Sequence, residues 1–119
     1  MSSLKTVSTW LSHAEILDAH VALSRLRERK VSLAFAYAIA RNLRALAPIV
    51  ETVDEVRRRI LQEHLKDNQL TEEGAAQWEE LLRKKVEVEL LKVKLKDLPS
   101  EIESVVLEAI LFMIEEEDD

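Results

Sequence analysis

The chain has 119 residues, 47% hydrophobic and 34% charged, with a formal net charge of -6. This length fits one domain, and a single glycine with two prolines favours a mostly helical protein. The absence of cysteine excludes disulfides and thiol chemistry, while the acidic balance disfavours direct DNA binding. No apolar run approaches the roughly 20 residues of a membrane span. We therefore expect a soluble cytoplasmic protein with no membrane contact.

The N-terminal part predicts a strand followed by a helix. Residues 4–11 carry β-branched and aromatic side chains in loose alternation, as in a short strand. Ser12 and Glu15 have the spacing of a capping box, and the helix they begin is expected to reach about Glu28. We expect Trp10 to be a core anchor.

A second, longer helix should follow. Ser32 is its expected cap, and residues 33–47 are apolar on nearly all sides, which is typical of a buried helix. Pro48 should kink this helix without ending it, because no turn residues flank it. The apolar stripe then continues to about Leu65.

Beyond this helix the pattern changes. Residues 66–70 predict a loop, and Thr71 a cap for a short helix to about Lys85. Residues 86–95 alternate with period two for most of their length, which predicts a strand. A final helix is expected over residues 101–115, with a wide apolar surface that covers the core or contacts another subunit. The short helix should bury Trp78, Leu81 and Leu82.

Together these elements predict a mostly α fold with a small β component (α+β). It should have four to five helices, a long kinked central helix and a short two-stranded antiparallel sheet. Residues 1–114 form the expected single domain, and residues 115–119 an acidic tail. Because two strands make a marginal sheet, pairing across a dimer would help, and we expect a homo-oligomer.

Arginine is segregated along the chain: eight of the nine lie between Arg25 and Arg59. Guanidinium is a planar fork that binds carboxylate or phosphate with two parallel hydrogen bonds, so the segregation suggests an anion-binding face. Five of these eight arginines have a simpler explanation. Three arginines fall near the end of the first helix, where cations suit the helix dipole. Two more are expected to form i,i+4 ion pairs, Asp54–Arg58 and Glu55–Arg59.

Arg41 and Arg44 remain, three residues apart on one face of the apolar helix. A guanidinium there must be paired or face a cleft, because an unpaired buried charge is costly. One interpretation is an internal salt bridge to Glu15, Asp18 or Glu28. The other is an anion-binding pocket in which Tyr37 supplies a stacking surface and Asn42 an amide.

Nothing in the sequence indicates catalysis. No nucleophile with a base can be identified, and Glu87 and Glu89 belong to the solvated face of a strand. The three histidines lack the spacing of metal ligands. We therefore expect a protein that is not an enzyme and has no cofactor or metal.

Several stretches carry a family resemblance. Residues 22–26, Lys30, 36–48 and 55–61, with the later 78–82, 86–89 and 93–98, resemble a group of small proteins of tailed bacteriophages and prophages, most without an assigned role. The resemblance covers roughly residues 14–98. It implies a cytoplasmic product made in the host cell during infection, and it brings no catalytic residues.

Two functional hypotheses follow. The first is a non-enzymatic phage accessory protein that sequesters an anionic ligand, such as a nucleotide-type host immune signal, through Arg41 and Arg44. The alternative is a helical, oligomeric interaction or assembly module of a phage with no small-molecule ligand. A helix-turn-helix regulator is less well supported, because the second helix begins Leu33-Ala-Phe-Ala and offers no base-reading side chains.

Overall fold

The computed structural model describes residues 5–115. It is mostly helical, with a long central helix and short two-stranded sheets, which confirms the predicted fold class. The helices are α1 (His13–Leu26), α2 (Leu33–His64), α3 (Glu72–Arg83) and α4 (Ser104–Ala109). The strands are β1 (Thr6–Ser12), β2 (Leu65–Lys66), β3 (Gln69–Leu70), β4 (Lys85–Leu91), β5 (Val93–Lys94) and β6 (Ile114–Glu115). Single 3-10 turns span Leu95–Asp97 and Leu111–Met113.

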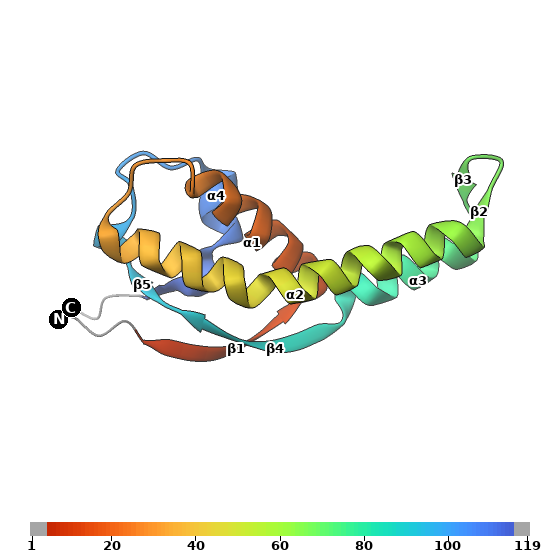
Figure 1. Ribbon diagram of the computed structural model, residues 1–119, viewed down its shortest axis with the longest axis horizontal. Helices are drawn as coiled ribbons and strands as arrows, with labels where there is room; N and C mark the ends of the chain where they lie inside the picture. Colours follow the sequence, from red (N-terminus) through yellow and green to blue (C-terminus); the bar gives the residue numbers. More distant parts are fainter. Residues whose placement is uncertain (1–4, 116–119) are drawn as a thin grey trace.

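The body of the molecule is built on the β1–β4 sheet. The two strands are antiparallel, in a register that runs from Thr6 opposite Leu91 to Ser12 opposite Lys85. Helix α1 and the first half of α2 lie on one side of this sheet, and no described element covers the other side (Figure 1). The C-terminal segment also contributes to the core, and the fully buried side chains of the body include Ile16, Leu23, Leu26, Phe35, Ile39, Leu46, Val93, Ile110 and Met113.

Local signals set the helix starts as predicted. The Ser12 hydroxyl accepts from the Glu15 N–H at 3.1 Å, and the Glu15 carboxylate accepts from the Ser12 N–H at 2.8 Å. This is a complete capping box. Helix α1 ends at Leu26, two residues before the predicted end.

Helix α2 continues through Pro48, as predicted. Ser32 caps it by accepting from the Phe35 N–H, and its 32 residues correspond to about 48 Å of helix. Proline has no N–H, so the carbonyl of Arg44 lacks the usual i+4 donor. The Thr52 hydroxyl donates to the Pro48 carbonyl at 3.0 Å one turn later.

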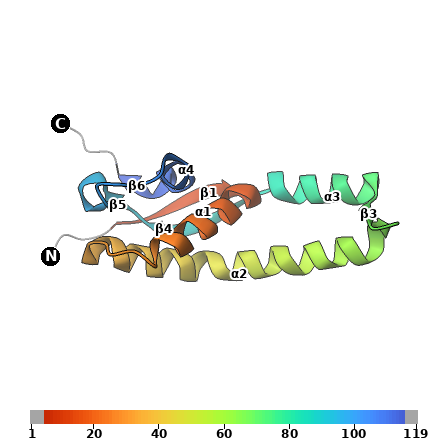
Figure 2. The ribbon, with the colours of Figure 1, turned by 90° about the horizontal axis from the view of Figure 1, so that it is seen from above.

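The second half of α2 and α3 lie side by side as an arm that extends beyond the body (Figures 1 and 2). The molecule measures 55 × 26 × 23 Å, and its radius of gyration is 16.6 Å. A compact chain of this length would have about 14 Å. Val53 and Ile60 are buried in the arm, but Trp78, Leu81 and Leu82 are only half-buried. The prediction that these last three are buried was wrong, because α3 packs mainly against α2, with fewer contacts to α1, and the rest of its surface is exposed.

The tip of the arm is a hairpin where a loop was predicted. Strands β2 and β3 pair Leu65 with Leu70, and Asp67 and Asn68 between them have φ values of 53° and 62°. Two residues with positive φ form the tight turn that matches strand twist. Asx residues tolerate this conformation, although the usual glycine is absent.

The predicted C-terminal helix over residues 101–115 was wrong. Only the six residues of α4 are α-helical, and they have no side-chain cap. The chain then tightens into a 3-10 turn and pairs as β6 with β5, Val93 opposite Ile114, in parallel. Burial explains the departure, because Val106, Ile110 and Met113 enter the core while Ile114 pairs with a strand. Glu115, the first residue of the predicted tail, belongs to β6, and residues 116–119 lie outside the described part.

Trp10 is not a core anchor: its side chain is 61% exposed. Successive strand residues point to opposite faces, and Leu11 takes the buried face at 3% exposure. Trp10 therefore lies on the uncovered face of the sheet, opposite Glu87. Because helices cover only one face of the sheet, one of the two residues Trp10 and Leu11 has to be exposed.

Helix α2 is long and apolar enough, by length and composition alone, to cross a membrane. Core helices of soluble proteins meet the same criterion. In this structure, the apolar surface contributes Phe35, Ile39 and Leu46 to the core formed with α1 and β4. The presence of this helix does not decide location.

Candidate functional site: a hollow between α2 and β4

Asn42 joins α2 to the edge of the sheet. Its side chain is 1% exposed, and both ends of its amide contact the backbone of Leu91. The side-chain oxygen accepts from the Leu91 N–H at 2.8 Å, and the amide nitrogen donates to the Leu91 carbonyl at 3.0 Å. The amide thus makes with Leu91 the two hydrogen bonds that a residue of a neighbouring strand would make.

The same edge of β4 is unpaired further along. The backbone N–H of Lys92 donates to the carbonyl of Lys5. In the antiparallel ladder, the N–H and C=O groups of the even-numbered residues of β4 therefore point toward β1. The N–H and C=O groups of odd-numbered residues therefore point away from β1. Those of Leu91 are taken by Asn42, whereas those of Glu87 and Glu89 have no hydrogen-bond partner within residues 5–115.

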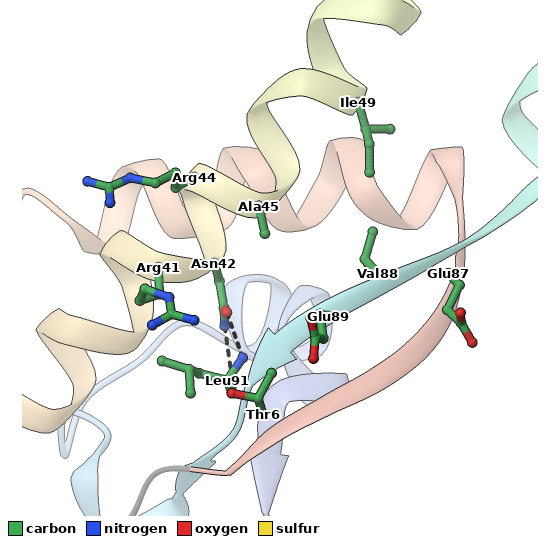
Figure 3. Close-up of a pocket in the computed structure, with 10 residues that line it drawn as sticks. All are labelled: Thr6, Arg41, Asn42, Arg44, Ala45, Ile49, Glu87, Val88, Glu89 and Leu91. Atoms are coloured by element: carbon green, nitrogen blue, oxygen red, sulfur yellow. Dashed lines mark hydrogen bonds between the residues drawn. The ribbon is translucent and has the colours of Figure 1, made fainter.

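A hollow of about 470 Å³ lies between this edge and α2 (Figure 3). It is open to solvent on one side. Helix α2 contributes one wall and β4 the opposite one, with Thr6 of β1 at one end. Its lining residues are Thr6, Arg41, Asn42, Arg44, Ala45, Ile49, Glu87, Val88, Glu89 and Leu91.

The two arginines singled out from the sequence both border this hollow. Arg41 points toward β4, and Arg44 extends away from the strand into solvent (Figure 3). A terminal nitrogen of Arg41 lies 3.2 Å from the hydroxyl of Tyr37, and the guanidinium carbon lies 6.0 Å from the centre of that ring. Tyr37 thus supports Arg41 from one helical turn away.

The internal salt bridge considered for these arginines does not form. Within the described residues, no carboxylate oxygen lies within 4.0 Å of Arg41 or Arg44. Both side chains are exposed, although Glu87 and Glu89 line the same hollow. The salt-bridge interpretation is therefore wrong, and the anion-binding pocket stays a prediction.

The arginines near residue 58 are engaged elsewhere. Asp54 accepts from Arg58 at 2.6 Å and from Arg57 at 2.9 Å, which confirms the predicted Asp54–Arg58 pair. These hydrogen bonds, from Arg58 first and then Arg57, lower the pKa of Asp54. The predicted Glu55–Arg59 pair was wrong, because it is not among the ion pairs of the described chain.

Asn42 was predicted as a ligand-binding amide, but its hydrogen-bonding atoms are occupied by Leu91. We assign it a structural role and leave it out of the binding proposal below. Sequence reasoning missed Glu89, whose carboxylate borders the hollow (Figure 3). Period-two alternation placed it on a solvated face, but no local signal indicated that α2 would lie beside it.

The chemistry available here is binding by charge and hydrogen bonds. The hollow is lined by two arginines, two glutamates and the unpaired backbone groups of the β4 edge. Tyr37 is not one of its lining residues and contacts Arg41 from outside the hollow. No group of three or more His, Asp or Glu side chains within residues 5–115 is arranged to hold a metal ion.

Comparisons with protein-family models, with curated proteins and with solved structures found no match to this chain.

Proposed function

We propose that this protein is a non-enzymatic binder of an anionic, nucleotide-type ligand, held in the hollow between α2 and β4 by Arg41 and Arg44. The observation that carries the proposal is that Arg41 and Arg44 both line the hollow and that neither guanidinium has a carboxylate partner within residues 5–115. Other arginines of the same helix, Arg57 and Arg58, are paired with Asp54. A guanidinium without a counter-charge is free to bind phosphate with two hydrogen bonds.

The opposite wall favours a nucleotide over a bare phosphate. The Glu89 carboxylate repels a phosphate placed beside it but accepts hydrogen bonds from ribose hydroxyls or from a base amine. The unpaired N–H and C=O groups of Glu87 and Glu89 supply one donor and one acceptor each. A ligand with a phosphate at one end and sugar or base at the other matches both walls.

The resemblance to phage proteins suggests which ligands to test first. A phage accessory protein of this kind would sequester a nucleotide-type host immune signal, and sequestration needs a pocket without a catalytic base. Cyclic nucleotides and ADP-ribose-type nucleotides are the corresponding chemical classes.

Isothermal titration calorimetry of the full chain with these nucleotides tests the proposal. We expect saturable binding that weakens about tenfold or more in Arg41→Ala and in Arg44→Ala, because each removes a charge-assisted contact worth about 1.5–3 kcal/mol. Binding should also weaken with added salt. Arg59→Ala is the matched control, an exposed arginine of the same helix outside the hollow, and it should bind as the wild type does.

Absence of binding at millimolar ligand, or equal affinity in wild type and the Arg41→Ala/Arg44→Ala double variant, would overturn the proposal. That outcome would favour the second candidate, a phage interaction or assembly module without a small-molecule ligand. The uncovered face and edges of the β1–β4 sheet are the observation in its favour.

A further inference from the structure

Strand β1 has an open edge. Its odd-numbered residues pair with β4, so the N–H and C=O groups of Thr6, Ser8 and Trp10 point the other way. Within residues 5–115 these groups have no hydrogen-bond partner. Such an edge is a template for another strand.

The usual protections of an edge strand are missing from β1. Its sequence, Thr-Val-Ser-Thr-Trp-Leu-Ser, has no charged residue, no proline and no glycine. Natural edge strands are commonly blunted by lysine, proline or a bulge. Here, seven consecutive residues pair regularly with β4, and the exposed Trp10 lies on the face that no described element covers.

The opposite edge of the sheet, on β4, carries charged residues and is partly occupied. On β4, Asn42 occupies the backbone of Leu91, and Glu87 and Glu89 flank the remaining open groups. Pairing β4 with a second β4 would bring carboxylates of like charge together, which is unfavourable. The uncharged edge is therefore the one suited to a second copy of this chain.

We infer that the protein forms a two-fold symmetric homodimer through antiparallel pairing of β1 with β1 of a second copy, centred on Ser8. In this register Ser8 faces Ser8, and Thr6 faces Trp10 of the other copy. All of these residues direct their free N–H and C=O groups to the shared edge, so each pair exchanges both hydrogen bonds.

The side chains also match in this register. Directly opposite residues share a face, so on the uncovered face Trp10 lies opposite Thr6 of the other copy and diagonal to its Ser8. On the covered face, Val7 lies opposite Thr9, and both are half-buried in the single chain. The result is one four-stranded antiparallel sheet, which removes the marginality of two strands. The dimer stands independently of the anion-binding proposal.

The test is the mass of the full chain in solution, measured by sedimentation equilibrium over a range of concentrations. The expected mass is twice 13.7 kDa. Ser8→Lys places two ammonium groups opposite each other at the two-fold axis, and it should raise the dissociation constant about tenfold or more. Its side chain faces solvent in the single chain, so circular dichroism should stay unchanged.

Glu89→Lys is the matched control. Residue 89 lies directly opposite Ser8 on β4 and on the same face, but one strand away from the proposed contact. It should remain dimeric. A Trp78→Phe background isolates Trp10, whose fluorescence should shift to shorter wavelength as the concentration rises through dimerisation.

A wild-type mass of 13.7 kDa at every concentration would overturn the inference. So would a Ser8→Lys variant that dimerises as tightly as the wild type. A dimer lost in Glu89→Lys but kept in Ser8→Lys would place the contact on β4 and contradict the proposed register.

Discussion

At the scale of single residues, Asn42 has the clearest structural role. Replacing it with alanine would leave the N–H and C=O of Leu91 buried without partners, each at a cost of about 1–3 kcal/mol. We expect Asn42→Ala to lower the free energy of unfolding by about 2 kcal/mol or more in urea titrations. Arg41→Ala, one residue away and exposed, should change it by less than about 0.5 kcal/mol.

This pair of variants separates a structural amide from a ligand-binding one. If Asn42→Ala kept full stability and lost only nucleotide binding, the structural assignment would be wrong. Arg41 is exposed and Asn42 is buried, although they are adjacent on one helix. A loss of stability seen only in Asn42→Ala therefore comes from the buried amide and not from a change in helix propensity.

The residues of the hollow were only partly accessible to sequence reasoning. Arg41 and Arg44 stood out because charges interrupt an apolar helix, and that signal is local. The bonds from Asn42 to Leu91 join positions 49 residues apart, and nothing in either segment encodes the partner. Trp10 was misplaced because its size favoured burial over the alternation that puts Leu11 inward.

At the scale of elements, prediction succeeded where the signal lay within a few residues. The capping box of α1, the Ser32 and Thr71 caps and the period-two pattern of β4 all formed as expected. The C-terminal segment was mispredicted because its apolar spacing fits one long helix and fits equally a short helix followed by a 3-10 turn and a strand. The pairing of β6 with β5, which the local sequence does not encode, selects the second of these arrangements.

The arm depends on a close approach at the single glycine. A methyl group added at Gly74 would lie 2.6 Å from Cβ of His64 and 2.8 Å from a methyl of Leu70. Overpacking of this kind costs about 1–3 kcal/mol, whereas alanine gains at most about 1 kcal/mol in helix propensity. We therefore expect Gly74→Ala to destabilise the arm, measured as faster hydrogen exchange in α3. The exposed Gln77→Ala in the same helix is the control, and slower exchange in Gly74→Ala would contradict the expectation.

At the scale of the whole molecule, the body and the arm differ in how they are held together. The main core draws on α1, the first part of α2, β4 and the C-terminal segment, and none of its buried residues comes from α3. In the arm, α3 packs mainly against the second half of α2, with fewer contacts to α1. Regions with few buried apolar contacts open at lower free energy than the core.

We accordingly expect native-state hydrogen exchange to resolve two stabilities. Amides of α3 should exchange through local opening, while buried amides of α1 should exchange only at the free energy of global unfolding. Mass spectrometry of exchanged peptides measures both in one experiment. Equal protection of α3 and α1 would show that the arm and body unfold as one unit.

The hairpin at the end of the arm has a practical consequence. Asp67 and Asn68 form an exposed turn at the end of the arm farthest from the body (Figure 1). Exposed turns of this kind accept inserted sequence with little cost to the remainder of a fold. An epitope tag or fluorophore placed between these two residues would report on the protein from a distance, with neither the arginines of α2 nor the edge of β1 disturbed.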